Sequence, residues 1–203
     1  MSSTEVEVGP AVDEQRTALV ATLSTKLGSA LVGSHIRPGD DLWIRVTVDA
    51  WADTFRMLRD AHGLKFFNWL SAIDWMPSPF GRDMDAEVDS ILQGKVAKAA
   101  EPTVTGYAGG DTRFQVLGRL HNLADRWGIT IKADIPDDTL TVPSIISVFV
   151  GANWHEREVA EMYGIDFAGH PDQRKLYLPT GFEGYPLRKD FPLLARRIKP
   201  WPG

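Results

Sequence analysis

The sequence predicts an α+β fold: a small mixed β-sheet with helices packed on one face, followed by an extended, proline-rich arm at the C-terminus. Segments with apolar residues at helical spacing alternate with segments in which every second residue is apolar, an order typical of a sheet covered by helices. Six of the 13 prolines lie in residues 171–203, where they fix φ and remove backbone donors. The last part of the chain is therefore expected to be neither helix nor sheet.

The first half of the chain supplies a helix, a strand and a second helix. Residues 13–32 have apolar side chains at helical spacing, and Asp13 can accept a hydrogen bond at the start of this helix. Residues 41–48 alternate between apolar and other side chains, which predicts a strand. Residues 49–62 return to helical spacing, and Gly63 is expected to end the second helix.

The second half supplies three more strands and a helix. Residues 65–76 are rich in aromatic side chains and are interpreted as a buried strand with a partly helical beginning. Strands are also predicted at 112–120 and 128–133, and the sequence Pro-Asp-Asp at 136–138 is expected to turn the chain. A further helix is predicted at 153–164, between a capping pattern at Asn153 and a glycine stop at Gly164.

These elements suggest one core domain with appendages. Residues 1–12 are polar and acidic and are expected to be a flexible tail. The α+β core is assigned to 13–164. Within it, 77–110 is interpreted as an insertion at the edge of the domain, because both of its ends are rich in Pro and Gly. Residues 165–203 form the extended arm, which is interpreted either as a docking arm or as a solvated tail.

Composition excludes several kinds of site. The chain has no cysteine, which rules out disulfides, thiolate nucleophiles, cysteine-type zinc sites and ordinary iron–sulfur ligation. No apolar run is long enough to cross a bilayer and the N-terminus is acidic, so neither a membrane anchor nor a signal peptide is expected. Net charge is −5, although residues 171–203 carry seven Lys and Arg against three acidic residues. This basic segment has aromatic neighbours, but the acidic balance of the whole chain disfavours nucleic-acid binding.

The last predicted helix carries a dense group of charged residues. Asn153 and Glu156 have the spacing of a capping box, with Asn in place of Ser or Thr, and Gly164 is placed to end the helix. Arg157 and Glu161 stand one turn apart and can pair, within the chain or else with a partner, and such a pair stabilises an exposed helix by about 0.2–0.5 kcal/mol.

Acid–base chemistry on the same helix is a weaker alternative. His155 and Glu156 begin like the zinc motif HExxH, but the second histidine would fall at Val159, so the motif fails. Glu158 and Glu161 share a helix face and could form a pair of catalytic carboxylates. The sequence shows no partner for such chemistry, and it contains no glycine-rich nucleotide loop and no GxSxG motif.

The chain after Gly164 combines prolines with apolar and charged residues. His170 lies in the turn sequence Gly-His-Pro-Asp and is interpreted as a hydrogen-bonding turn residue rather than a ligand. An arm of this kind is stable only when it lies on a surface, either of its own domain or of a partner. The stretch GYPLRKDFPL, residues 184–193, is interpreted as a strap in which Arg188 and Asp190 form charged clamps. The apolar anchors of the arm are Leu176, Leu178, Phe182, Leu187, Phe191 and Leu193.

The stretch EREVAEMYGIDFAGHPDQRKLYLPTGFEGYPLRKDFPL closely resembles the signature of the C subunit of respiratory complex I (NADH–quinone oxidoreductase), the bacterial counterpart of the mitochondrial 30-kilodalton subunit. The clear match runs from residue 153 to residue 193, about a fifth of the chain. The departures are Gln173, Lys175 and Tyr185, where the family usually has leucine, arginine and histidine. The resemblance marks as interface and structural residues Glu156, Arg157, Glu158, Glu161, His170, Asp172, Arg174, Leu187, Arg188, Lys189, Asp190 and Phe191.

The resemblance implies an accessory subunit of the peripheral arm of a proton-translocating NADH–quinone oxidoreductase, at the cytoplasmic face of the cell membrane. Its expected partners are the other peripheral-arm subunits, especially the quinone-site subunit, and membrane association would come only through the complex. No catalytic, cofactor or metal site is expected on this chain, because NADH, flavin, iron–sulfur clusters and quinone belong to partner subunits. The nearest rival is a homologous component of a membrane-bound nickel–iron hydrogenase, and nucleic acid is not an expected partner.

Overall fold

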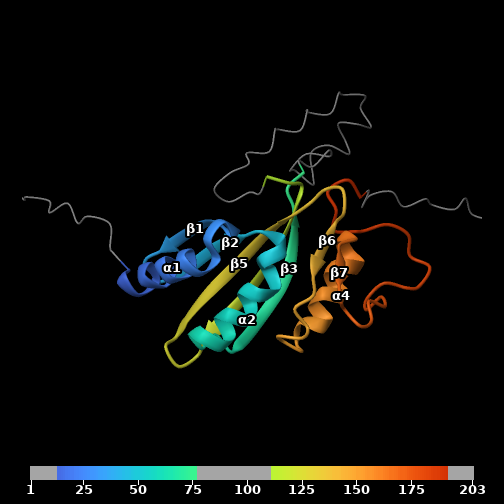
Figure 1. Cartoon of the computed structure of the whole chain (residues 1–203). Helices are drawn as coiled ribbons and strands as arrows, with labels where there is room; N and C mark the ends of the chain where they lie inside the picture. Colours follow the sequence, from blue (N-terminus) through green and yellow to red (C-terminus); the bar gives the residue numbers. More distant parts are fainter. Residues whose placement is uncertain (1–12, 77–110, 192–203) are drawn as a thin grey trace, which may run out of the picture.

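The computed structural model describes residues 13–76 and 111–191 of the 203-residue chain (Figure 1). The tail predicted at 1–12, the insertion predicted at 77–110 and the end of the arm at 192–203 lie outside the described residues.

Helices and strands follow one another in the described part much as the sequence predicts. The helices are α1 (Glu14–Leu27), α2 (Trp51–His62) and α4 (Ala152–Tyr163), with short 3-10 turns η1 (Gly28–Ala30) and η2 (Val48–Ala50). The strands are β1 (Leu31–Arg37), β2 (Asp41–Val46), β3 (Phe66–Asp74), β4 (Phe114–Asn122), β5 (Trp127–Ile135), β6 (Thr141–Pro143) and β7 (Asp166–Ala168).

Five of these strands form one mixed sheet in the order β1-β2-β5-β4-β3. β2 and β5 run parallel, and the other neighbouring pairs run antiparallel. β6 and β7 form a separate parallel pair beside α4 (Figure 1). This arrangement confirms the predicted α+β class with a small mixed sheet.

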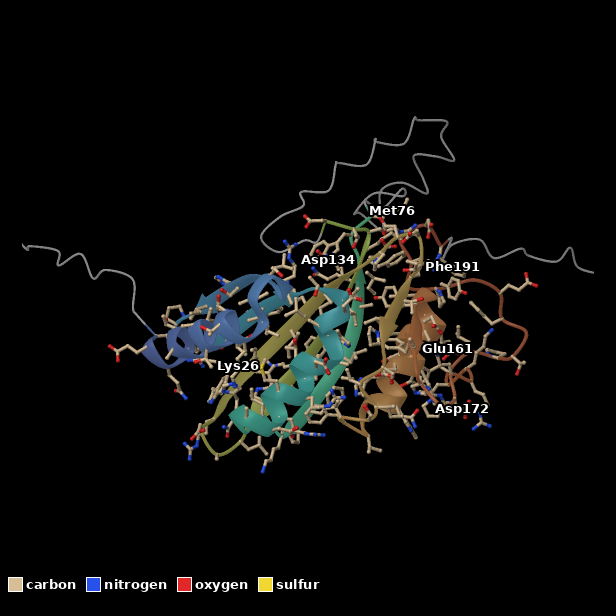
Figure 2. The ribbon with its side chains drawn as sticks, viewed as in Figure 1. Lys26, Met76, Asp134, Glu161, Asp172 and Phe191 are labelled. Carbon is tan, nitrogen blue, oxygen red and sulfur yellow. The ribbon has the colours of Figure 1, made fainter. Side chains whose placement is uncertain are left out.

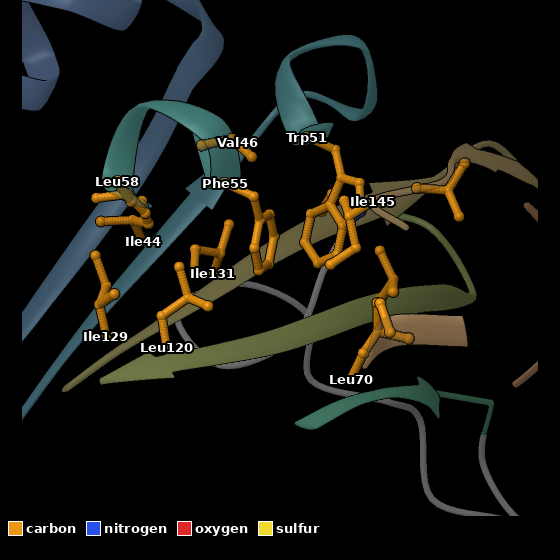
Figure 3. Close-up of a cluster of buried hydrophobic side chains, with 14 of the residues drawn as sticks. Ile44, Val46, Trp51, Phe55, Leu58, Leu70, Leu120, Ile129, Ile131 and Ile145 are labelled. Carbon is orange, nitrogen blue, oxygen red and sulfur yellow. The ribbon is translucent and has the colours of Figure 1, made fainter. Parts of the chain in front are cut away.

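The hydrophobic core lies between the helices and one face of this sheet (Figure 3). Trp51 and Phe55 of α2 meet edge to face, with ring centroids 4.7 Å apart. They rest on Gly118 of β4, where an added Cβ would lie 2.5 Å from the Phe55 ring, so a larger residue would push α2 off the sheet. Phe149 contacts both Phe55 and Phe67 and thereby continues the core from α2 towards α4.

The first helix is shorter than predicted. Asp13 accepts the backbone N–H of Arg16 and caps the helix as expected. The prediction of a helix over 13–32 is wrong at its C-terminal end, because Gly28 takes a φ of 55° and ends the helix. Leu31–Arg37 then forms β1, an edge strand that the helical spacing had concealed.

Two further differences concern strands. β3 is extended from Phe66 onward, so the partly helical beginning predicted for 65–76 is wrong. The strand predicted at 41–48 ends at Val46, because the next residues form the turn η2. β6 and β7 contain three residues each, too few for an alternating pattern to reveal them.

The core continues beyond residue 164, where the sequence analysis ended it. Ile165 and Phe167 are buried members of the core, and Phe167 lies on β7, which pairs with β6. Within the described residues, the last member of the core is Phe167. The irregular part of the chain therefore begins after Ala168 rather than at residue 165.

Candidate functional site

The candidate site is α4 together with the chain that follows β7. Figure 1 shows this last part of the described chain looping around α4, and Figure 2 labels Glu161 on the helix with Asp172 and Phe191 on the chain beside it. The helix ends at Gly164, whose φ of 72° lies in the left-handed region that closes helices, so the predicted stop is confirmed.

Glu156 is a buried anchor rather than a cap. The capping box predicted for Asn153 and Glu156 is wrong, because the helix starts at Ala152 and its first turn has no side-chain cap. The fully buried Glu156 carboxylate instead accepts the Ser144 hydroxyl at 2.6 Å and the Ile145 N–H at 2.7 Å. Burial raises the pKa of Glu156 to about 7, although both hydrogen bonds oppose the rise.

His170 lies beside Glu156 and makes the turn contacts expected of it. Its side chain is fully buried, Nδ1 accepts the N–H of Asp172 at 3.0 Å, and Nε2 lies 3.1 Å from Oδ1 of Asn153. Because Nδ1 is an acceptor, the ring hydrogen resides on Nε2 and is donated to Asn153. The Glu156 carboxylate is 4.0 Å from the same Nε2.

Glu161 holds the loop after this turn. Its nearly buried carboxylate accepts the backbone N–H groups of Leu176 at 2.8 Å, of Tyr177 at 3.0 Å, and of Leu178. Burial alone would raise the pKa of Glu161, but these three donors and the nearby Lys175 outweigh burial and lower it. A carboxylate that accepts three N–H groups keeps its charge and fixes the backbone of this loop.

Arg157 binds the same loop through its carbonyl groups. Its Nε donates to the carbonyl of Arg174 at 2.9 Å, and its Nη2 donates to that of Lys175 at 3.4 Å. Among the ion pairs between described residues, none joins Arg157 to Glu161, so the predicted pair is wrong. Two side chains one turn apart thus bind backbone groups of opposite polarity in one loop.

Replacing Glu161 with Gln is expected to loosen this loop. The amide can accept fewer N–H groups and its own N–H₂ opposes them, so we expect a loss of about 2 kcal/mol in the free energy of unfolding. Chemical denaturation at neutral pH, together with amide exchange at Leu176 and Leu178, measures the effect. Glu158→Gln is the control, because Glu158 makes no hydrogen bond within the described part of the chain. Equal stability of the two variants would contradict this role of Glu161.

The strap is fastened to its own domain at the end of α4. The N–H of Leu187 donates to the carbonyl of Met162 at 3.2 Å. Nε of Arg188 donates to the carbonyl of Tyr163 at 2.6 Å, and its guanidinium stacks over the rings of Tyr185 and Phe114. Arg188 is therefore an intramolecular clamp.

Asp74, the last residue of β3, binds the other half of the strap. Its fully buried carboxylate accepts Nε and Nη2 of Arg113 at 3.0 and 2.8 Å, the N–H of Lys189 at 2.8 Å, and the N–H of Met76 at 3.0 Å. Arg113 also pairs with Asp190 at 3.0 Å. Burial would raise the pKa of Asp74, but Arg113 and the two backbone donors outweigh burial and lower it.

The three charged residues of the strap therefore have different roles. Arg188 and Asp190 bind their own domain. The strap is therefore bound to the surface of this chain and does not need a partner protein for these contacts. Lys189 contributes its backbone N–H to Asp74, while the residue itself is exposed. Tyr185 and Leu187 are 41% and 49% exposed, and Tyr177 in the preceding loop is 60% exposed.

The remaining signature residues lie around this framework. Asp172 and Arg174 pair with each other at 2.7 Å on the surface. Phe191 stacks on Phe182 and lies 2.8 Å from where a Cβ of Gly184 would be, so the positive φ and the contact both favour glycine there.

Sequence reasoning missed Asp74, Arg113 and Ser144. Asp74 and Arg113 flank residues 77–110, so their proximity follows from the hairpin-like pairing of β3 with β4 and not from a local motif. The sequence did contain one indication of the role of Asp74, because a charged residue stands there at the end of an aromatic-rich strand. Ser144 follows β6, which was itself unrecognised.

The acid–base alternative on α4 involves His155, Glu158 and Glu161. Residues 13–76 and 111–191 contain no cluster of His, Asp and Glu that could hold a metal ion. His155 packs edge-on against Phe67, with ring centroids 5.4 Å apart, and within the same residues no hydrogen bond joins it to Glu158 or Glu161. In the described part of the chain, no helix has the length and apolar character needed to cross a membrane.

Fold and site define a two-layer α+β domain whose C-terminal chain is fastened over its own last helix. Residues 44–197 match the family described as respiratory-chain NADH dehydrogenase, 30 Kd subunit, and the chain belongs to this family. The C subunit of NADH-quinone oxidoreductase from Bartonella bacilliformis is 35% identical over 182 residues, which cover 89% of this chain and 72% of that protein.

Shorter matches are closer in sequence. A C subunit of NADH-quinone oxidoreductase from Rhizobium etli, numbered 2 in that organism, is 53% identical over 87 residues, which cover 43% of this chain and 46% of that protein. The matched region thus spans less than half the length of this relative.

Two solved structures share the fold. One is Nqo5 of a trypsin-resistant fragment, with a TM-score of 0.52 and 21% identity, covering 77% of this chain and 98% of that chain. The other belongs to the membrane-bound sulfane sulfur reductase, an archaeal respiratory membrane complex, with a TM-score of 0.59 and 18% identity. That match covers 89% of this chain and 88% of the neighbour.

Proposed function

We propose that this chain is a non-redox accessory subunit in the peripheral arm of a proton-translocating NADH–quinone oxidoreductase. In this proposal it supports electron transfer from NADH to quinone by packing against the quinone-site and cluster-bearing subunits. It is held at the cytoplasmic face of the membrane through those partners and binds no NADH, flavin, cluster or quinone itself. Membership of the 30 Kd subunit family and the names of the oxidoreductase relatives support the proposal.

The observation that carries the proposal is the orientation of the strap. Backbone groups and the charges of Arg188 and Asp190 bind inward, to Tyr163, Asp74 and Arg113. The exposed side chains include Tyr177, Leu187 and Lys189, while Tyr185 and Asp190 are only partly covered, by Arg188 and by Arg113. A rigid backbone that presents Tyr and Leu outward is the arrangement of a protein–protein contact surface.

The experiment separates folding from assembly by changing only outward side chains. The double variant Leu187→Ser, Lys189→Glu removes an exposed apolar group and reverses an exposed charge. We expect its melting temperature to match wild type within about 2 °C, because Leu187 is 49% exposed and Lys189 is exposed, so little side-chain packing is lost. Recovery of the chain with its oxidoreductase partners from detergent-solubilised membranes should fall at least about tenfold, since losing a contact worth about 1.4 kcal/mol gives that factor.

The matched control is Arg37→Ala, which removes an exposed charge at the end of β1, outside the arm. It is expected to leave both the melt and the recovery unchanged. Normal recovery of the double variant would contradict the outward strap surface. Recovery of wild-type chain without any oxidoreductase subunit would contradict the proposed complex.

A further inference from the structure

Four buried or half-buried polar side chains join three separate segments of the chain at the base of the arm. Glu156 and Asn153 belong to α4, Ser144 follows β6, and His170 lies in the turn after β7. The side chains of Glu156 and His170 are both fully buried, and 4.0 Å separates Oε2 from Nε2. Because both groups are buried at this distance, the hydrogen bonds that one group makes depend on the charge of the other.

Ser144 allows Glu156 to hold either protonation state in place. A charged carboxylate accepts the Ser144 hydroxyl, whereas a neutral carboxyl can donate to the same oxygen, because a hydroxyl serves as donor or acceptor. The N–H of Ile145 donates to the other carboxyl oxygen in both states. Within the described residues no Lys or Arg pairs with Glu156, and His170 is the titratable group that faces it.

His170 is restrained to one tautomer. The N–H of Asp172 points at Nδ1, so a hydrogen on that nitrogen would face another hydrogen. The single ring hydrogen therefore stays on Nε2, which lies between two acceptors, Asn153 Oδ1 at 3.1 Å and Glu156 Oε2 at 4.0 Å.

We propose that Ser144, Asn153, Glu156 and His170 form a proton-responsive hydrogen-bond network that controls the position of the turn at residues 169–172. When the Glu156 carboxyl releases its proton to solvent, the carboxylate attracts the Nε2–H of His170 away from Asn153. The ring moves from Asn153 towards Glu156, and the Asp172 N–H follows Nδ1. Because this turn leads into the loop that Glu161 and Arg157 bind, the change reaches the root of the arm.

The pKa of Glu156 supports this geometric argument, because burial raises it to about 7. The network therefore changes state within the physiological range of pH. It belongs to the chain by itself and does not depend on the proposed function.

The test is a pH titration of the isotope-labelled full chain by long-range ¹H–¹⁵N correlation of the histidine rings, from about pH 5.5 to about pH 8.5. We expect the Nε2 resonance of His170 to move with a midpoint near 7, the pKa of Glu156. The Asp172 amide should move with the same midpoint, since it donates to Nδ1. In Glu156→Gln both movements should disappear.

A second variant keeps the test decisive if Glu156→Gln does not fold. Ser144→Ala removes a donor that lowers the pKa of Glu156, so the midpoint should move to higher pH. His155 contacts Phe67 and lies outside the network, so it is the internal control. Its resonances should not differ between wild type and the variants at the same pH. The proposal is overturned if the His170 resonance does not move with this midpoint, or if the movement persists unchanged in the variants.

Discussion

Asp74→Asn is expected to destabilise the domain by about 3 kcal/mol, because it removes a buried negative charge that binds Arg113 and two backbone N–H groups. The Asn side chain offers one acceptor oxygen to four donors, two of them on Arg113 and two on the backbone of Met76 and Lys189. Its N–H₂ group also faces the Arg113 guanidinium. Chemical denaturation measures the loss, and amide exchange at Lys189 reports whether the strap is released.

The pH dependence of this effect has a definite sign. The folded-state pKa of Asp74 is lowered, so the stabilisation is complete above the unfolded-state value of 3.8 and is lost as pH falls through the folded-state value. Wild type should therefore approach Asp74→Asn in stability only in acid. Asp60→Asn is the matched control, because the Asp60–Arg59 pair is exposed to solvent and is expected to contribute little to stability. A loss no larger than in this control would contradict the role of Asp74.

The fold could be predicted from the sequence wherever a long periodic pattern coincided with an end signal. α2 ends at Gly63 and α4 at Gly164, both with left-handed φ, as the sequence indicates. The prediction was wrong where a pattern was short or continued by chance. The apolar residues after Leu27 extend the helical spacing of α1, yet Gly28 ends the helix and the following residues pair with β2.

The candidate site was predictable as a set of residues but not as a set of contacts. Several residues marked by the family resemblance lie on α4 or bind it, whereas Lys189 and Asp190 bind Asp74 and Arg113. Their partners are distant in sequence, since Asp74 and Lys189 stand 115 positions apart. The capping box and the Arg157–Glu161 pair were wrong because local spacing favours contacts within a helix. In the structure, Glu156 and Arg157 bind backbone groups of other segments instead.

Truncation after Pro179 removes the strap and tests how folding and assembly divide. The deletion eliminates the bonds from Arg188 to Tyr163, from Lys189 to Asp74, and from Asp190 to Arg113. It spares the Glu161 bonds to residues 176–178 and every described member of the core, which ends at Phe167.

We expect the truncated chain to fold with a cooperative melt at a temperature lower by roughly 5–10 °C, since the lost bonds contribute about 2–3 kcal/mol and each kcal/mol shifts Tm by about 2–4 °C. It should not co-purify with the oxidoreductase, because the outward Tyr185 and Leu187 are gone. Arg188→Ala is the intermediate control: it removes one inward clamp, so the melt should fall by a smaller amount. An unchanged melt would show that the inward bonds do not stabilise the domain. Normal co-purification would show that partners bind another surface, and failure to fold would show that the strap completes the core.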